Sequence, residues 1–482
     1  MPAASAGEGG PGLPAGWGLR LDRHTVRPRA AILIGGFPVR ALRLSDGGSR
    51  LIDTWSAGGV VSPRVGARRL ARRLTDGGVA HPLPHPTGDD PHLTVTTVIP
   101  VRDRVAGLAV TLGGMTDDTD VVVVDDGSTD AAALQAAADL RPGPTTVLRH
   151  PQSRGPGAAR NTGWRQADGD LVAFVDADVE LPASWLTGLV PHFADPTVAA
   201  VAPRVVAVAG SCCPAWLAAY EAVRSPLDLG DQPAPVRPRS RVSYVPTTAL
   251  VVRRRALADL GGFDEAMRTG EDVDLIWRLA EAGWRVRYQP DMVVAHPSRQ
   301  RLGAWVGQRI DYGRSAAPLY AHHGPAVAPL VISAEAAAVG AAALFAHPVI
   351  ALAIAATAVG RVTARLGRHT PRGALTRLAV LAQGRAMAAS AEAARRVWWP
   401  LAVATAVVSP RSRPALLTAF VFPALLSWVR NRPAVDLLRW SLLYVADDVA
   451  YGIGVWAGVA RTGEVGALRP VINYRARGGS AR

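Results

Sequence analysis

The sequence contains no lysine, so all 53 basic residues among its 482 residues are arginines. It contains only two cysteines, the adjacent Cys212 and Cys213. Two adjacent cysteines exclude a disulfide framework and a zinc cluster built on cysteine, and they fit a cytoplasmic location. The first 18 residues lack the basic and apolar regions of a secretory signal, and we expect them to form a disordered lead.

The net charge of +14 is unevenly distributed. Residues 301–482 hold 21 arginines and 7 acidic residues, whereas residues 1–300 hold 32 of each kind. A basic, acid-poor region beside apolar stretches favours an anionic membrane surface over nucleic acid as its partner. An arginine-rich soluble surface is the alternative.

Changes in composition divide the chain into segments. After the lead, residues 19–85 have the short apolar runs and helical spacing of a small domain, and the Pro- and His-rich residues 86–92 form a linker. Val-rich strands alternate with helices over residues 93–300, which predicts an α/β domain built on a largely parallel sheet. Residues 301–482 are an Ala- and Arg-rich helical region.

A membrane-spanning helix needs about 20 apolar residues. In the last region only the stretch 326–360 clearly offers that length, because 397–408 is too short and 442–459 contains Asp447 and Asp448. We therefore expect a membrane-associated region with one or two spans. An Ala-rich helical bundle, packed on the sheet domain or lying on a membrane, is the alternative.

Polar residues follow several of the expected strands. Pro100, Val101 and Arg102 end the first strand, at the carboxyl edge where open α/β sheets bind ligands. The adjacent Asp125 and Asp126 end the second strand. A carboxylate there can accept the imide N–H of a uracil base, although capping of the next helix is a competing role.

Two arginines follow the Asp125-Asp126 pair, and a further pair of acids follows the arginines. Arg154 and Arg160 lie in a Gly-containing segment, and their planar guanidinium groups suit phosphate. Asp176-Ala177-Asp178 follows a buried strand, so Asp176 and Asp178 face the same side. Two carboxylates at that separation repel unless a cation lies between them, which predicts a Mg²⁺ or Mn²⁺ site that also holds a diphosphate.

Together these motifs resemble those of family-2 glycosyltransferases with the GT-A fold, and Asp176-Ala177-Asp178 matches that family's DXD motif. The resemblance covers about residues 94–297. It implies a UDP-sugar donor whose uridine is held by Asp126 and Arg154. It also implies that Asp176 and Asp178 bind a divalent metal together with His296, which follows the last strand of the domain.

The downstream half of the domain extends the resemblance. Gly261 and Gly262 resemble the family's glycine loop before the acceptor site, and Glu271 begins a helix there. In the family, the aspartate of the Glu-Asp pair, Asp272 here, is the general base of inverting transfer. A carboxylate in that place can take the proton of an acceptor hydroxyl, although Glu271, Asp272 and Asp274 also suit a helix N-terminus.

Segments outside the sheet domain resemble the mycofactocin-system glycosyltransferases. They are RLTDGGVAHPLP, which ends the N-terminal module, and YGRSAAPL at residues 312–319. This resemblance implies transfer of glucose from UDP-glucose to the peptide-derived redox cofactor premycofactocin, building a short glucan. The N-terminal module itself resembles winged-helix peptide-recognition domains, although a purely supporting role is equally open.

Two other functions remain open. A membrane glycosyltransferase acting on a lipid or polysaccharide acceptor would have the same catalytic motifs. The Gln-x-x-Arg-Trp signature of processive synthases is absent, however, and Gln308-Arg309 is only a loose echo of it. A non-enzymatic scaffold that binds peptide or membrane is the third possibility, and the complete set of acidic positions speaks against it.

Overall fold

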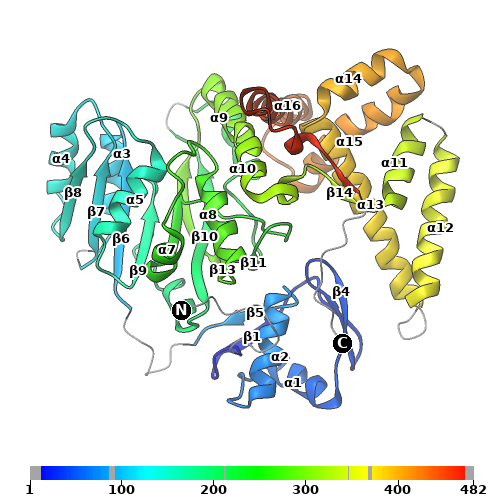
Figure 1. Ribbon diagram of the computed structural model, residues 1–482, viewed down its shortest axis with the longest axis horizontal. Coiled ribbons are helices and arrows are strands. Elements are labelled where there is room, and N and C mark those ends of the chain that lie inside the picture. The colour runs from blue at the N-terminus through cyan, green and yellow to red at the C-terminus, as the bar shows by residue number, and fades with distance from the viewer. Residues whose placement is uncertain are drawn as a thin grey trace. The chain divides into compact units, whose positions relative to one another are not determined.

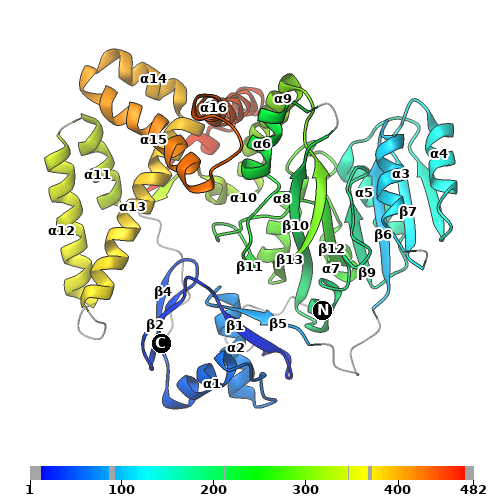
Figure 2. The same cartoon turned by 180° about the vertical axis from the view of Figure 1, so that it is seen from behind.

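The computed structural model describes residues 12–85, 93–116, 118–210, 213–345, 347–366 and 372–472. The chain divides into two compact units (Figures 1 and 2). The first unit contains residues 1–209 and 224–298, and the second contains residues 210–223 and 299–482. The expected linker at 86–92 and residues 1–11 of the expected lead lie outside the described residues.

The first unit begins with a small module of two helices and two short sheets. Its elements are β1 (Gly18–Leu21), β2 (Val26–Arg29), β3 (Ile32–Gly35), β4 (Arg40–Arg43), α1 (Asp46–Ser56), α2 (Val65–Asp76) and β5 (Ala80–Leu83). Strands β2, β3 and β4 form an antiparallel sheet, and β1 pairs with β5. Leu13 and Trp17, expected to belong to the disordered lead, are instead buried in the core of this module. The module's likeness to winged-helix domains stays a prediction.

Three ion pairs, one of them buried on both sides, join the module to the sheet domain within this unit. The guanidinium of Arg72 lies 2.6 Å from Asp195, and both side chains are almost fully buried. Asp22 accepts hydrogen bonds from His81 and from Arg241 of the sheet domain. A third pair joins Arg285 to Asp76 at 2.9 Å. Such pairs constrain geometry more than they add stability, because desolvation offsets much of their attraction.

The sheet domain is built on eight strands in the order β11-β13-β10-β12-β9-β6-β7-β8. These are β6 (Val95–Val101), β7 (Asp120–Asp125), β8 (Thr145–Arg149), β9 (Leu171–Val175), β10 (Val198–Val208), β11 (Ala234–Val236), β12 (Ala249–Arg253) and β13 (Arg285–Pro297). Strands β9, β6, β7 and β8 run parallel, as do β10 and β13, whereas β12 runs antiparallel between β9 and β10. The expected α/β fold is confirmed, and the antiparallel strands β11 and β12 make its sheet mixed.

Helices cover this sheet because its central strands are apolar on both faces. They are α3 (Val105–Gly113), α4 (Ala131–Asp139), α5 (Pro156–Gln166), α7 (Arg254–Leu260) and α8 (Glu271–Glu281), with the 3-10 helix η1 (Val190–Ala194). Asp130 caps α4 by accepting from the Ala133 N–H, and Pro156 occupies the first turn of α5, where its missing N–H costs nothing. Because β6, β7 and β9 run parallel, their carboxyl ends lie at the same edge of the sheet.

The second unit is helical. Its helices are α6 (Ala215–Arg224, whose last residue belongs to the first unit), α9 (Leu302–Arg314), α10 (Ala316–His323), α11 (Ala334–Phe345), α12 (Pro348–Leu366), α13 (Arg372–Arg396), α14 (Trp399–Val408), α15 (Arg413–Asn431) and α16 (Leu437–Thr462). Short elements link them, namely η2 (Gly324–Val327), β14 (Val331–Ile332), η3 (Pro410–Ser412), η4 (Val465–Leu468) and β15 (Val471–Ile472). Helices α9 and α16 cross so closely that a Cβ on Gly313 would lie 2.0 Å from the Tyr451 carbonyl oxygen.

The core of this unit contains two buried acids on α16. Asp447 accepts hydrogen bonds from Arg309 and from the hydroxyl of Tyr220, and Asp448 pairs with Arg395. A buried carboxylate without a cation would be costly, so these contacts explain how an apolar helix tolerates two aspartates.

The structure corrects the expectation for the stretch 326–360. It is divided among η2, β14, α11 and α12, so it does not form one helix of membrane-spanning length. Within the described residues, the helices long and apolar enough to cross a membrane are Pro410–Asn431 and Leu437–Thr462. Half of the most apolar window of the second is buried inside the protein, as in the core helix of a bundle.

Candidate active site

The Asp126 carboxylate organises the loop that follows β8. Its Oδ1 accepts from His150 Nδ1 and the Arg154 N–H, each at 2.8 Å, and its Oδ2 accepts from Ser153 Oγ at 2.7 Å and the Gly155 N–H at 2.9 Å. Burial alone would raise the pKa of Asp126, but these hydrogen bonds outweigh burial and lower it. Both oxygens of Asp126 are therefore engaged by the protein itself.

The neighbouring Asp125 is differently placed. Its Oδ1 accepts from the Ser128 N–H at 2.8 Å, which forms the turn after β7. Its Oδ2 lies 3.1 Å from the guanidinium of Arg149, a side chain that is 43% exposed. The Asp125 side chain itself is only 2% exposed, so its Oδ2 would accept another donor only after the exposed Arg149 turned into solvent.

Of the three residues expected to bind a metal, Asp178 and His296 lie together, and His296 is near the end of β13 rather than after the strand as expected. His296 Nε2 lies 3.3 Å from Asp178 Oδ1, and both side chains are 12% exposed. Arg104, just before α3, donates to Asp178 Oδ2 at 2.6 Å. Asp176 lies two residues before Asp178 and keeps 27% of its side chain exposed. Two carboxylates and an imidazole are a donor set that fits Mn²⁺ or Mg²⁺.

The buried side chain of Arg160, on α5, joins two acidic groups. One terminal nitrogen donates to Glu271 Oε1 at 2.8 Å, and the other donates to Asp176 Oδ1 at 2.9 Å. Burial alone would lower the pKa of Arg160, but the charges of Asp176 and Glu271 raise it, so the guanidinium stays protonated. One cation thus connects the acids after β9 with the first turn of α8.

Asp272 lies beside Glu271 at the start of α8. Its Oδ1 accepts from the Val273 N–H at 2.8 Å, the only hydrogen bond to this carboxylate within the described part of the chain. Burial raises the pKa of Asp272 to about 7, and the charge of Glu271 acts in the same direction. A carboxylate with a pKa near neutrality is suited to accepting a proton.

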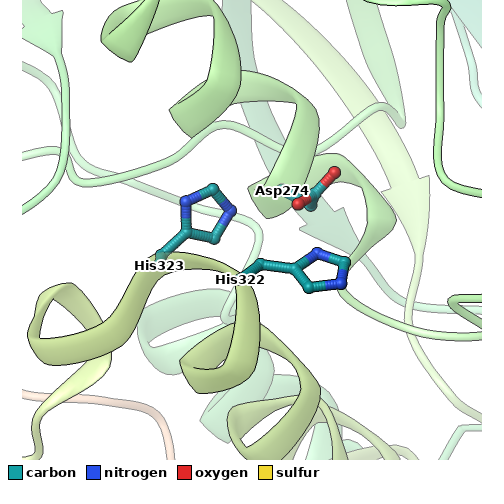
Figure 3. A group of neighbouring side chains, drawn as sticks. All are labelled: Asp274, His322 and His323. Atoms are coloured by element: carbon teal, nitrogen blue, oxygen red, sulfur yellow. The ribbon is translucent and has the colours of Figure 1, made fainter.

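The acid two residues further along α8 has a structural role. Asp274, labelled in Figure 3, is fully buried, and its carboxylate accepts from Arg278 Nε at 2.6 Å, one helical turn away. The other side chains drawn in Figure 3, His322 and His323, end α10 of the helical unit. Because its carboxylate is paired with Arg278, Asp274 has a different role from Asp272, the candidate base on the same helix.

The two glycines expected near the acceptor site shape the turn after α7. Both adopt left-handed backbone angles, with φ of +74° at Gly261 and +80° at Gly262. A Cβ on Gly262 would lie 2.3 Å from Asn161 Oδ1. Asn161, on α5, also accepts from the Phe263 N–H and donates to the Phe263 carbonyl, each at 2.9 Å. These contacts hold the loop that leads into Gly270 and α8.

The remaining donor-site candidates lie at the same edge of the sheet. Pro100 and Val101 end β6, and the Val101 carbonyl accepts from the Asp126 N–H at 2.8 Å. Arg102 is exposed in the next turn, 3.6 Å from Asp103. Arg154 is also exposed, and its guanidinium pairs with Glu265 at 2.8 Å. Ala177 is buried between the two acids of its motif.

Sequence reasoning missed Arg104, His150 and Asn161 as contributors to this site. Arg104 and His150 each contact a candidate carboxylate, and Asn161 holds the Phe263 loop. All three follow directly on a recognised motif or lie within it, and this closeness could have pointed to them. Their partners lie 24 to 102 residues away in the sequence, so spacing alone did not reveal them.

Comparison with known proteins places this geometry among sugar transferases. The family model described as "Glycosyl transferase family 2" matches residues 96–258. The "Pre-mycofactocin glycosyltransferase" of Mycobacterium tuberculosis (strain ATCC 25618 / H37Rv) is 43% identical over 479 residues, covering 95% of this chain and 98% of the relative. The human "Probable polypeptide N-acetylgalactosaminyltransferase 8" is 30% identical over 175 residues, covering 33% of this chain and 26% of that one.

Solved structures resemble parts of the chain. A mannosyltransferase from Pyrobaculum calidifontis in complex with GDP-Man and Mn²⁺ matches with a TM-score of 0.37 and 23% identity, covering 62% of this chain and 87% of that one. The structure of GalNAc-T7 with UDP, GalNAc and Mn²⁺ matches with a TM-score of 0.36 and 18% identity, covering 47% of this chain and 48% of that one.

Proposed function

We propose the reaction from the premise that the chain belongs to the pre-mycofactocin glycosyltransferases, a group within glycosyltransferase family 2. The proposed reaction is transfer of glucose from UDP-glucose to premycofactocin with inversion at the anomeric carbon, repeated to build a short glucan. The observation that carries it is the bridge through Arg160. This bridge brings Asp176, a metal and diphosphate candidate, next to the helix turn that carries Asp272.

The donor diphosphate and a divalent cation would be held by Asp176, Asp178 and His296. The cation, when bound, neutralises charge that develops on the UDP leaving group. Arg104 now occupies one oxygen of Asp178, but its side chain is 48% exposed and can move to a phosphate oxygen. Arg154 and Arg102, both exposed at this edge, are further candidates for phosphate or ribose contacts.

The uracil base needs a carboxylate oxygen that is available to its imide N–H. Asp126 was the expected acceptor, but its two oxygens already accept four hydrogen bonds. We therefore assign Asp126 to shaping the 150–155 loop and propose Asp125 Oδ2 as the base acceptor, with Arg149 moving aside.

Asp272 would take the proton of the acceptor hydroxyl as that oxygen attacks the anomeric carbon. Its raised pKa keeps the carboxylate a strong enough base at neutral pH. Glu271, bound to Arg160, would position Asp272 rather than touch the acceptor. Gly261 and Gly262 would act by shaping the acceptor loop.

The decisive test is the mass of the product formed from premycofactocin with UDP-glucose, UDP-galactose or UDP-N-acetylglucosamine and Mn²⁺. Addition of hexose units from UDP-glucose alone is expected. Asp272→Asn should abolish transfer while UDP binding stays within a few-fold, and Asp259→Asn, at an exposed position on α7, should leave both unchanged. Loss of UDP binding in Asp272→Asn would contradict the assignment of the base.

A lipid acceptor is the second candidate, favoured by the two helices that are long and apolar enough to cross a membrane. Polyprenyl phosphate in place of premycofactocin tests it. We also propose that the catalytic unit is cytoplasmic and that the helical unit associates with the cell membrane. The N-terminal module would either recognise peptide or support the sheet domain, and the ion pairs of Arg72 and Arg285 favour support.

A further inference from the structure

The helical unit exposes many large apolar side chains. Among the described residues, 21 such side chains lie between residues 302 and 472, whereas the sheet domain from residue 93 to 298 has three. One set of them lies on α14 and α15, two neighbouring helices joined by η3 (Figures 1 and 2). We call it the α14–α15 surface, formed by Leu401, Val407, Val408, Leu417, Val421 and Phe422, each between 39% and 84% exposed. Apolar groups of this kind mark interaction sites.

The neighbouring helices α13 and α16 hold α15 in the unit. Pro423 has no N–H, so the Ala419 carbonyl four residues earlier loses its helical donor, and Arg395 of α13 donates to that carbonyl at 2.9 Å. The indole of Trp440, on α16, donates to the Ala424 carbonyl at 3.0 Å. These two contacts attach α15 to α13 and α16 within the helical unit.

Charge indicates what covers the α14–α15 surface. No acidic residue occurs from Val397 to Val435, whereas arginines at 411, 413, 430 and 432 flank the helices and are exposed. A second copy of the chain would bring the same patch, and hence arginine against arginine, across a two-fold axis. An anionic lipid surface complements both the apolar side chains and the arginines.

Length excludes α14 as a span. Its ten residues extend about 15 Å, half of the roughly 30 Å hydrocarbon core. We propose that the α14–α15 surface lies in the headgroup region of an anionic bilayer, with both helices parallel to the membrane plane. This deepens the membrane association proposed above and does not require the transfer reaction.

The experiment measures sedimentation of the purified full-length chain with vesicles of phosphatidylcholine alone or with phosphatidylglycerol. Binding to the anionic vesicles is expected, with an at least tenfold loss for Leu417→Glu/Val421→Glu. The control Leu140→Glu places the same charge at a position 82% exposed in the sheet domain and should bind like wild type. Arg411→Gln and Arg430→Gln should each weaken anionic binding about fivefold.

Three results would overturn the proposal. They are absence of binding by a preparation that transfers sugar, equal binding by the double glutamate variant, and membrane-bound chain that resists extraction by alkaline carbonate, which indicates a span. A dimer in light scattering that the double variant dissociates, without vesicle binding, would assign the surface to a second copy. Failure of sugar transfer in a preparation that binds vesicles counts against the proposed reaction alone.

Discussion

Arg160 offers the sharpest test of how the site works. Its buried guanidinium holds Asp176 and Glu271 together and lowers the pKa of Asp272 through its charge. Replacing it with Met keeps much of the side-chain volume and removes the charge. We propose that Arg160 is a positioning residue for the base on α8, and that Arg160→Met changes the pH dependence of catalysis.

The magnitude follows from the pKa of Asp272, which is about 7 in the folded protein. Asp272 is then about half ionised at pH 7. Loss of one nearby opposite charge raises a carboxyl pKa by about 1 unit at the low end of such effects. The ionised fraction at pH 7 then falls to about a tenth, so kcat/KM should fall about fivefold and recover toward pH 9.

Stability should fall as well. Removing one partner of a buried ion pair costs about 3–5 kcal/mol, because the remaining charges stay buried. Arg160→Lys should recover part of the stability, since an ammonium pairs with one carboxylate but cannot bridge two in a fork. The control is Arg165→Met on the same helix, where the arginine is 53% exposed and its pair with Glu265 is 3.5 Å long.

The assay is kcat/KM for sugar transfer from pH 5.5 to 9 at saturating Mn²⁺, with thermal unfolding measured on the same samples. In Arg160→Met the rise of kcat/KM with pH should move to higher pH, whereas in Arg165→Met it should stay at the wild-type pH. A limb at the wild-type pH in a folded Arg160→Met protein would refute the link between Arg160 and Asp272.

Three further predictions follow from the site. Gly262→Ala should lower stability by about 2 kcal/mol or more in thermal unfolding, because φ is +80° and the new Cβ would meet Asn161 at 2.3 Å, whereas Gly261→Ala, with open space around it, should cost about 1 kcal/mol. Asp126→Ala leaves four donors without their acceptor and should weaken UDP binding in calorimetry, and wild-type affinity would contradict the loop assignment. EDTA should abolish sugar transfer, and added Mn²⁺ should restore it. Asp178→Asn should need a higher Mn²⁺ concentration than wild type. Full activity in EDTA would rule out the metal.

The ionisation of Asp272 also affects stability. An acid whose pKa rises on folding, from 3.8 to about 7, holds its proton more tightly in the folded state. Its ionisation therefore reduces the stability of the folded protein as pH rises from about 4 to 7, and Asp272→Asn should remove that loss.

The sequence alone indicated that strands and helices alternate in the sheet domain. Continuous Val-rich runs can be buried only in a sheet covered on both faces, so β6, β7, β8 and β9 were recognisable from composition. Acids directly after such strands must meet at one edge, which placed Asp126, Asp176 and Asp178 together. The family resemblance added Asp272 and His296, which lie too far along the chain for spacing to connect them.

Tertiary structure decided which groups are free to act. Only the fold shows that both oxygens of Asp126 accept hydrogen bonds from the 150–155 loop and that Arg278 donates to Asp274. These partners lie far away in the sequence or outside any motif. Tertiary structure also decided how the apolar helices of the second unit pack. Composition argued against a membrane span through Asp447 and Asp448, but buried arginines from other helices neutralise both acids, and only packing brings those charges together.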